Sequence, residues 1–189
     1  MYKVVYCSDL HGNEILYNKL LDFSIKNKVR AIIIGGDICP HAHMPLNLAI
    51  KYHKDFIEKF LFSYFKNAKE KNIELFIMMG NDDFKVNFNL LENAQKQGLT
   101  KILHNKLNKI NNKDIVGYSF VPPMPFLLKD WEKLDDKDSK QITDPSMDVR
   151  TVKKETGTIE DDIKKLKKLS NPKETIYVIH SPPFDTKLD

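Results

Sequence analysis

The chain has 189 residues, of which 41% are hydrophobic and 30% are charged, as expected for one folded globular domain and not for a disordered segment. Its 30 basic residues nearly balance the 26 acidic ones, so the formal net charge is only +4. Arg30 and Arg150 are the only arginines, and this scarcity of guanidinium groups disfavours a module that reads nucleic-acid sequence.

Three short apolar runs in the first half of the chain predict buried strands. They start at Lys3 (KVVYC), Ala31 (AIIIGG) and Leu75 (LFIMMG), and such continuous hydrophobicity is typical of strands covered on both faces. Amphipathic segments between the runs predict two helices, one capped by Asn13 and one over 48–71. The alternation of strand and helix predicts an α/β fold with a largely parallel sheet. We expect the first helix to bury the face that carries Ile15, Leu16, Leu20 and Phe23.

The second half of the chain is less regular. A strand is predicted from Asp114 (DIVGYSF), and it leads into the proline-rich loop VPPMPF. Residues 129–173 are strongly charged and are expected to form a solvated excursion, within which Thr158 caps one helix. A last apolar run, TIYVIH from Thr175, predicts another buried strand. Because no convincing boundary divides the sequence, a single domain over 1–189 is expected.

Polar residues follow four of these strands where each one ends. Ligands of open α/β sheets bind at the carboxyl ends of strands, so these side chains are expected to meet. Each residue taken singly also suits a turn or a helix cap. Clustered carboxylates, however, repel one another unless a cation lies between them, and mixed oxygen and nitrogen donors suit Mn²⁺, Fe or Zn²⁺. The sequence therefore predicts a dinuclear metal site built from Asp9, His11, Asp37, Asn81 and His180.

The segments SDLHG, GGD, GNDD and IHSPP resemble, in this order, the signature blocks of the calcineurin-like metallophosphoesterases. The resemblance implies a four-layer α/β/β/α sandwich with two divalent ions at one edge of the β layers, Mn²⁺ being favoured over Fe, Zn²⁺ or Ni²⁺. It implies that Asp9 and His11 bind the first ion, that Asp37 bridges, and that Asn81 and His180 bind the second. It further implies hydrolysis of a phosphomonoester or phosphodiester by a hydroxide that bridges the metals.

The chain departs from the family pattern after Asn81. Family members usually carry a histidine there, which protonates the leaving oxygen, whereas this sequence has Asp82. An aspartate with its ordinary pKa of about 3.9 is ionised at neutral pH and is a poor acid. We assign Asn81 and Asp82 as the catalytic residues and expect a preference for substrates with acidic leaving groups. His41 and His43 are alternative acids, although an exposed loop is the simpler interpretation of CPHAHMP.

A second departure concerns the end of the sequence. Family members normally end with a G-H-x-H block that completes both metal shells, and this sequence stops nine residues after His180 without one. We therefore expect a truncated domain that lacks the last strands of the sandwich, with weaker metal binding and reduced activity. Two other functions stay open: a nuclease of the same fold, and a catalytically impaired binding or scaffold protein that retains the fold.

Other features of the sequence indicate where the protein is located and what it binds. Cys7 and Cys39 show no disulfide or zinc-ribbon spacing, no apolar run reaches the roughly 18 residues of a membrane helix, and no signal peptide precedes the first strand. We expect a cytoplasmic protein that acts on a small phosphate ester, with nucleic acid less favoured and no membrane partner; oligomeric state is not predicted. Phe120, Phe126 and Trp131 are expected either to form an apolar wall beside the metals or to pack as a rigid connector.

Overall fold

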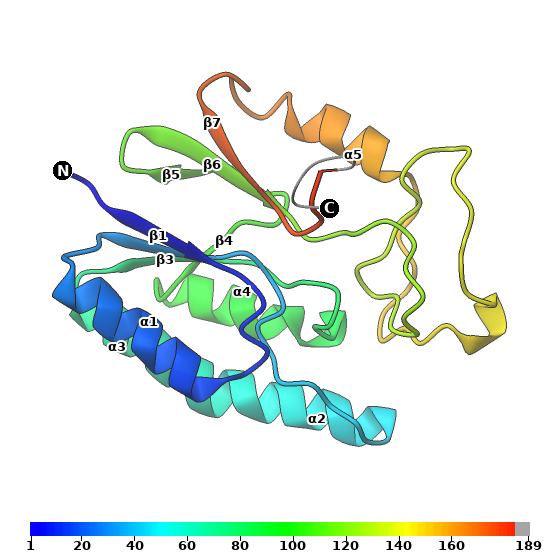
Figure 1. Cartoon of the computed structure of the whole chain (residues 1–189), viewed down its shortest axis with the longest axis horizontal. Helices are drawn as coiled ribbons and strands as arrows, with labels where there is room; N and C mark the ends of the chain where they lie inside the picture. The colour runs from blue at the N-terminus through cyan, green and yellow to red at the C-terminus, as the bar shows by residue number, and fades with distance from the viewer. Residues whose placement is uncertain (184–189) are drawn as a thin grey trace.

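Two β-sheets lie face to face, and helices cover the outer side of each sheet (Figure 1). The computed structural model describes residues 1–183 of the chain. One outer layer holds the four helices of the first half, and the other holds the helix that precedes the last strand (Figure 1). The architecture is the α/β/β/α sandwich that the family resemblance implies.

The first sheet contains four parallel strands in the order β1-β2-β3-β4. Their bounds are Val4–Cys7 for β1, Ala31–Ile34 for β2, Glu74–Ile77 for β3 and Lys101–Ile102 for β4. All four residues of β2 are buried, as its position between two other strands requires. Because the strands are parallel, β1, β2 and β3 all end at the same edge of the sheet.

Helices connect the strands of this sheet. α1 (Glu14–Lys26) begins after Asn13, whose side chain accepts a 3.1 Å hydrogen bond from the backbone N–H of Leu16, so the predicted cap is confirmed. The long helix expected over 48–71 is present in three consecutive parts. These parts are α2 (Leu46–Phe56), the π-helical turn η1 (Ile57–Leu61) and α3 (Phe62–Glu70), and α4 (Phe88–Lys96) follows β3 after the short 3₁₀ turn η2 (Lys85–Asn87).

The buried face of α1 differs from the prediction. Ile15 and Phe23 are exposed, with 67% and 54% of their surface accessible, whereas Tyr17 is fully buried. The ring of Tyr17 packs against Phe60 and Tyr64, and its hydroxyl donates a 3.0 Å hydrogen bond to the carbonyl of Ile38. Tyrosine buries a large apolar ring when its hydroxyl finds a partner, and hydropathy patterning underestimates this contribution.

The second sheet contains β5 (Asn108–Ile110), β6 (Lys113–Tyr118) and β7 (Thr175–Ile179) in that order. β5 is antiparallel to β6, and β6 is parallel to β7. α5 (Ile159–Leu166) covers this sheet, and the predicted cap is confirmed because Thr158 Oγ1 accepts from the backbone N–H of Asp161. The 3₁₀ turn η3 (Pro145–Met147) lies in the long segment between β6 and α5. The strand that carries His180 thus belongs to a different sheet from β1, β2 and β3.

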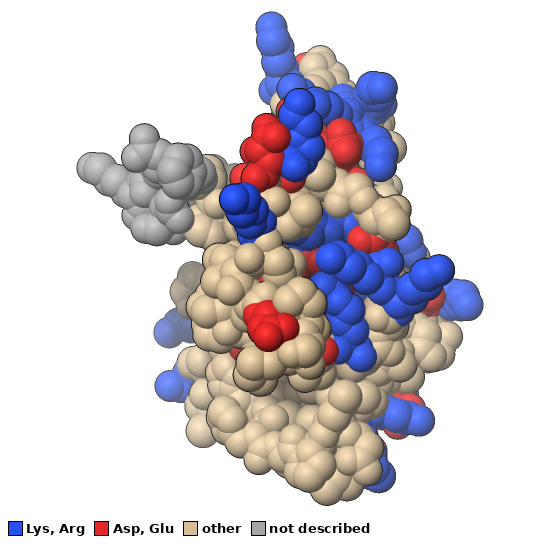
Figure 2. All heavy atoms as spheres, turned by 90° about the vertical axis from the view of Figure 1, so that its right-hand side faces the viewer, with Lys and Arg blue, Asp and Glu red and all other residues tan. Residues whose placement is uncertain are grey.

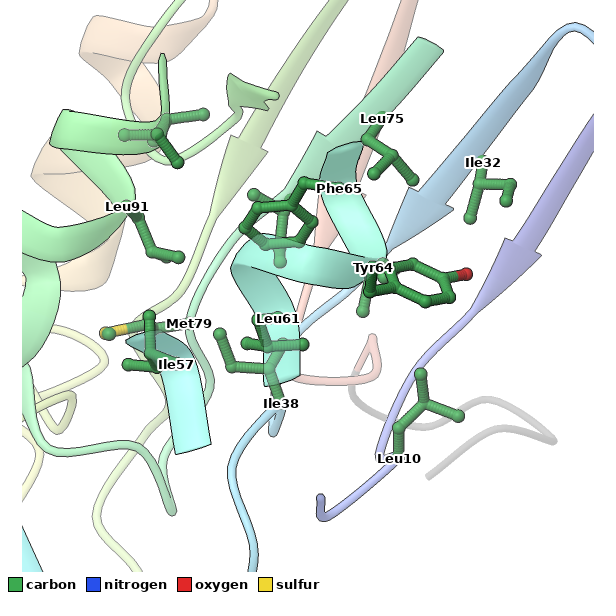
Figure 3. Packing of buried hydrophobic residues seen from close by; sticks show 14 of the residues in the cluster. Leu10, Ile32, Ile38, Ile57, Leu61, Tyr64, Phe65, Leu75, Met79 and Leu91 are labelled. Atoms are coloured by element: carbon green, nitrogen blue, oxygen red, sulfur yellow. The ribbon is translucent and has the colours of Figure 1, made fainter. Parts of the chain in front are cut away.

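Side chains of the first sheet alternate between two cores. Ile32 and Leu75 point toward the helices, where they meet Leu61, Tyr64 and Phe65 (Figure 3). The intervening positions face the second sheet. They form a smaller apolar cluster with residues of that sheet, and its members are Ala31, Ile33, Phe76, Met78 and Leu103 from the first sheet and its connections, and Ile110, Ile115 and Val178 from the second. Both faces of β2 and β3 are therefore covered, as their continuous hydrophobicity predicts. The prediction of a buried strand is wrong for β1, because this strand lies at the edge of the sheet and leaves Val4 and Tyr6 43% and 55% exposed.

The segment 129–173 is not the fully solvated excursion that its charge suggests. Lys129, Glu132 and Lys133 are each at most 5% exposed, and Trp131 between them is 1% exposed. Lys129 Nζ donates to Glu132 Oε2 at 2.6 Å, and Lys133 Nζ donates to Asp162 Oδ2 at 2.6 Å. Buried charges are tolerated when they are paired and hydrogen-bonded, so this part of the segment belongs to the folded interior.

Within residues 1–183, the structure has no helix long and apolar enough to cross a membrane.

Candidate metal centre

The loops that follow β1 and β2 are joined by backbone hydrogen bonds. The N–H of Asp9 donates to the carbonyl of Gly36 at 3.1 Å, and the N–H of His11 donates to the carbonyl of Asp37 at 2.9 Å. Asp9, His11 and Asp37 all have positive φ angles of 58°, 42° and 50°. Non-glycine residues adopt this left-handed conformation rarely, and such residues cluster at functional sites.

Asp37 lies at the centre of the site and is only 4% exposed. Its Oδ1 lies 3.5 Å from Nε2 of His180, and its Oδ2 lies 3.9 Å from Nε2 of His11. The backbone N–H of Asp82 also donates to Oδ1, at 2.9 Å. Burial alone would oppose ionisation, but the hydrogen bond and charge of His180 hold the pKa of Asp37 below its ordinary value. The two carboxylate oxygens therefore face two different imidazoles, an arrangement that would suit a residue shared by two cations.

His180 brings the second sheet into the site. Its Nδ1 lies 2.9 Å from the carbonyl of Gly35, so this nitrogen is a hydrogen-bond donor. Its Nε2 lies 3.0 Å from Asn81 Oδ1 and close to Asp37, so two oxygen acceptors converge on one nitrogen. Burial disfavours the imidazolium, yet the hydrogen bond and charge of Asp37 raise the pKa of His180 to about 9. A proton on Nε2 stabilises the two oxygen atoms that converge there. A metal cation bound between Nε2 and these oxygens would stabilise them in the same way.

Close backbone approach makes room for these side chains. A Cβ atom on Gly80 would lie 2.3 Å from Asp37 Oδ1 and 2.5 Å from His180 Nε2. A Cβ atom on Gly36 would lie 2.5 Å from Nδ1 of His180. Glycine is thus required at both positions, because any side chain would occupy the space in which the donor atoms meet.

All five residues predicted as metal ligands lie in this region. Asp9, Asp37 and His180 each offer a ligand atom, and these atoms lie within 4.8 Å of one another. Asn81 is within 3.0 Å of His180, and His11 faces the second oxygen of Asp37. Carboxylate and amide oxygens combined with imidazole nitrogens fit Mn²⁺, Fe or Zn²⁺. The residues present therefore fit a pair of divalent ions, and their assignment to individual ions stays a prediction.

Asp82 lies between two histidines at the edge of the centre. Its Oδ2 is 3.4 Å from Nδ1 of His41 and 3.8 Å from Nδ1 of His11. The imidazoles of His11 and His41 are stacked, with centroids 4.1 Å apart and an interplanar angle of 23°. Nitrogen lone pairs lie in the ring plane, so two stacked rings do not direct them at one ion. Burial, followed by the charge of Asp37, raises the pKa of Asp82, while both histidines oppose this effect.

Asp83 is a buried residue of the site that the sequence analysis missed. It is fully buried, and its carboxylate accepts hydrogen bonds from the N–H groups of Gly80 at 2.9 Å, Ile38 at 3.0 Å and Cys39 at 2.8 Å. It therefore joins the loop after β3 to the loop after β2. Burial and the neighbouring Asp37 raise the pKa of Asp83 to about 7, although the three donors favour the ionised form. The second aspartate of GNDD was the available signal.

An apolar groove of about 490 Å³ opens beside Asp82 and His41. Phe120, Phe126 and Trp131, which the sequence suggested as an aromatic wall beside the metals, do not line this groove. Phe120 and Trp131 are each 1% exposed and pack in the core, and Phe126 is 58% exposed and outside the groove lining. Leu127 and Leu128 line the groove instead. Phe120 and Trp131 thus agree with the alternative prediction, in which they pack on the core as part of a rigid connector.

The chain belongs to the calcineurin-like phosphoesterase family, because residues 2–187 match the sequence model of that family. Members of this family are generally phosphoesterase hydrolases and typically bind two divalent metals. Solved structures share the fold: the crystal structure of TT1561 from Thermus thermophilus has a TM-score of 0.61 and 14% identity, covering 98% of this chain and 70% of that one. A second crystal structure has a TM-score of 0.59 and 14% identity, covering 96% and 69%. No curated protein sequence matches this chain.

Proposed function

We propose that this protein is a metal-dependent phosphoesterase that hydrolyses a phosphomonoester or phosphodiester of a small organic molecule. Asp9, His11, Asp37, Asn81 and His180 would hold two divalent ions, with Mn²⁺ as the favoured metal. The observation that carries this proposal is the position of Asp37, whose two carboxylate oxygens face the imidazoles of His180 and His11.

Two bound divalent ions would lower the pKa of a coordinated water toward neutrality and would neutralise the charge of a phosphate group. The protein itself supplies the positions of the donors. The Gly35 carbonyl fixes the ring of His180, and the N–H of Asp82 fixes the carboxylate of Asp37. Neither arginine is placed to clamp the phosphate, since Arg30 precedes β2 at the opposite edge of the sheet and Arg150 donates to the carbonyl of Lys129.

Asn81 and Asp82 are the catalytic residues of this proposal. Asn81 directs its amide oxygen toward His180 and donates from its amide nitrogen to Asp82 Oδ1 at 2.8 Å. Asp82 lies between the metal ligands and the apolar groove, where a leaving group would depart. Asp82 and His41, which lie 3.4 Å apart, are the two side chains at this position that would donate a proton to the leaving oxygen.

The experiment is a hydrolysis assay of chelator-treated protein that is reloaded with Mn²⁺, Zn²⁺ or no metal. p-Nitrophenyl phosphate and bis-p-nitrophenyl phosphate report monoesterase and diesterase activity, and Asp37→Asn is the control. We expect hydrolysis only with divalent metal and a loss of at least 100-fold in Asp37→Asn, because electrostatic stabilisation of this kind contributes several kcal/mol. Metal-loaded protein that hydrolyses neither compound would favour a binding or scaffold function, and preferential cleavage of single-stranded DNA would favour a nuclease.

A further inference from the structure

Asp82 and His41 line the apolar groove, and none of the five predicted metal ligands is among its lining residues. The walls of the groove come from α2 and the loop before it, from Phe84, and from two stretches of the long segment after β6, namely Leu127 with Leu128 and the region of Val149. The apolar side chains that line it are Ala42, Met44, Leu46, Ala49, Phe84, Leu127, Leu128 and Val149.

The groove offers apolar surface to the solvent and has a fixed shape. Met44, Leu46 and Leu127 remain 41% to 45% exposed, so a ligand that covers them would gain from removing apolar surface from water. The far wall is held by backbone hydrogen bonds, since the N–H of Val149 donates to Leu127 and the N–H of Lys129 donates to Val149, both at 2.8 Å. A preformed pocket binds ligands at a smaller entropic cost.

The charges around the groove restrict what it can bind. No Lys or Arg is among the residues that line it, and its polar side chains are those of Asp82, His41, His43 and His53. Figure 2 shows the end of the molecule at which the lining segments lie: the middle of the lower part is largely tan, and Lys and Arg gather above it and along both of its edges. A polyphosphate or a nucleic-acid backbone would therefore enter without the Lys and Arg side chains that usually neutralise such ligands.

We infer that the groove is a substrate subsite, and that it holds an uncharged apolar aryl or alkyl group of the phosphate ester. The inference deepens the proposed function and rests on it. With phosphorus at the metal centre, the organic group on the leaving oxygen would pass Asp82 and lie against Leu46 and Leu127. Water breaks the P–O bond, giving inorganic phosphate and the free alcohol or phenol, so no other reactant is needed.

A series of 4-alkylphenyl phosphates, from phenyl through methyl and propyl to butyl, tests this subsite. A para-alkyl group changes the size of the leaving group with little change in its acidity. We expect kcat/KM to rise about fourfold for each methylene that the groove buries, which corresponds to the ordinary transfer free energy of a methylene.

Leu46→Asp and Leu127→Asp place a charge on the groove wall and should abolish this rise, while inhibition by inorganic phosphate stays unchanged. Leu48→Asp is the matched control, because Leu48 is on the same helix, is 51% exposed and does not line the groove. It should keep the full rise. Circular dichroism verifies that all three variants fold.

Three results would overturn the subsite. They are a flat kcat/KM across the series in an active enzyme, an equal loss in Leu48→Asp, and faster hydrolysis of ATP or single-stranded DNA than of 4-butylphenyl phosphate. If no ester is hydrolysed, the proposed function fails, and calorimetry with non-hydrolysable 4-alkylphenyl phosphonates then decides on the groove alone. Affinity that rises with alkyl length and falls in Leu46→Asp would support it, and length-independent affinity would overturn it.

Discussion

Nε2 of His180 lies 3.5 Å from Oδ1 of Asp37, although the two residues follow strands of different sheets. Asp37 follows β2 of the first sheet, and His180 follows β7 of the second. The candidate metal centre is therefore assembled by the packing of the two sheets, through the apolar cluster that includes Ile33, Phe76 and Val178. Changes that shift one sheet against the other should weaken metal binding even when they touch no ligand.

Gly80→Ala should weaken metal binding. The new Cβ atom would meet Asp37 Oδ1 at 2.3 Å and His180 Nε2 at 2.5 Å, so the two donors would have to separate. We expect at least a tenfold loss of Mn²⁺ affinity by calorimetry. Gly157→Ala is the control, because a Cβ atom there meets nothing within 4 Å and costs only the strain of a positive φ, roughly 1 kcal/mol. Equal affinity in both variants would contradict the close-approach argument.

Asp83→Ala should lower the stability of the protein, whereas Asp82→Ala should alter its turnover, although the two residues are adjacent. Loss of the Asp83 carboxylate leaves three backbone N–H groups without their acceptor, and we expect a destabilisation of about 3 kcal/mol or more in urea unfolding. Asp82 is partly exposed and its side chain anchors no backbone group, so Asp82→Ala should change stability by less than about 1 kcal/mol while it alters turnover. A stable Asp83→Ala variant would refute this division of roles.

Glu132→Gln should be strongly destabilising because it leaves Lys129 charged in the interior. The Lys129 side chain is 0% exposed and that of Glu132 is 4% exposed, and removing one partner of a buried pair typically costs about 3–5 kcal/mol. Glu58→Gln breaks an exposed pair with Lys54 and should cost less than about 1 kcal/mol. Comparable losses in chemical denaturation of the two variants would show that the buried pair is not required.

His104 should make the protein less stable as the pH falls below neutrality. Burial is the main cause that lowers the pKa of His104 to about 3, and the charges of Lys85 and Lys133 act in the same direction, against Glu155 and Asp162. The unfolded chain binds this proton near pH 6.5, so the contribution is complete above that pH and is lost as the pH falls toward 3. We expect about 1.4 kcal/mol of lost stability between pH 7.5 and 5.5.

The measurement is urea unfolding of metal-free protein at several pH values, with His104→Phe as the comparison. The variant removes a hydrogen bond that the Ser119 N–H donates to His104 Nδ1, which lowers stability equally at every pH. The difference between wild type and variant should therefore shrink as the pH falls. A constant difference would indicate that His104 does not titrate with unfolding.

The positions of the candidate ligands followed from local sequence. Asp9, Asp37 and Asn81 each come within a few residues of a strand end, and parallel strands bring such ends to one edge. Periodicity alone does not show to which sheet a strand belongs, and only the family resemblance implied a second β layer to hold His180. β4 and β5 contain two and three residues, too few to show a pattern, so neither was predicted.

Other errors arose because charge and hydropathy patterns do not show which side chains pair with each other in the folded protein. The sequence KDWEK reads as solvated, yet Lys129 and Lys133 are buried because Glu132 and Asp162 pair with them over three and 29 residues. Pairing over such a distance depends on the tertiary fold and leaves no local signature. The burial of Asp83 also depends on the tertiary fold, because its three backbone partners come from two loops.

The most direct test of the metal centre is the metal content of wild type and Asp37→Asn, measured by mass spectrometry after loading with Mn²⁺ and gel filtration. The account predicts two ions per wild-type chain and the loss of both together in the variant, because each Asp37 oxygen faces a different set of donors. Wild-type protein without bound metal, or a variant that retains one ion at full affinity, would contradict it.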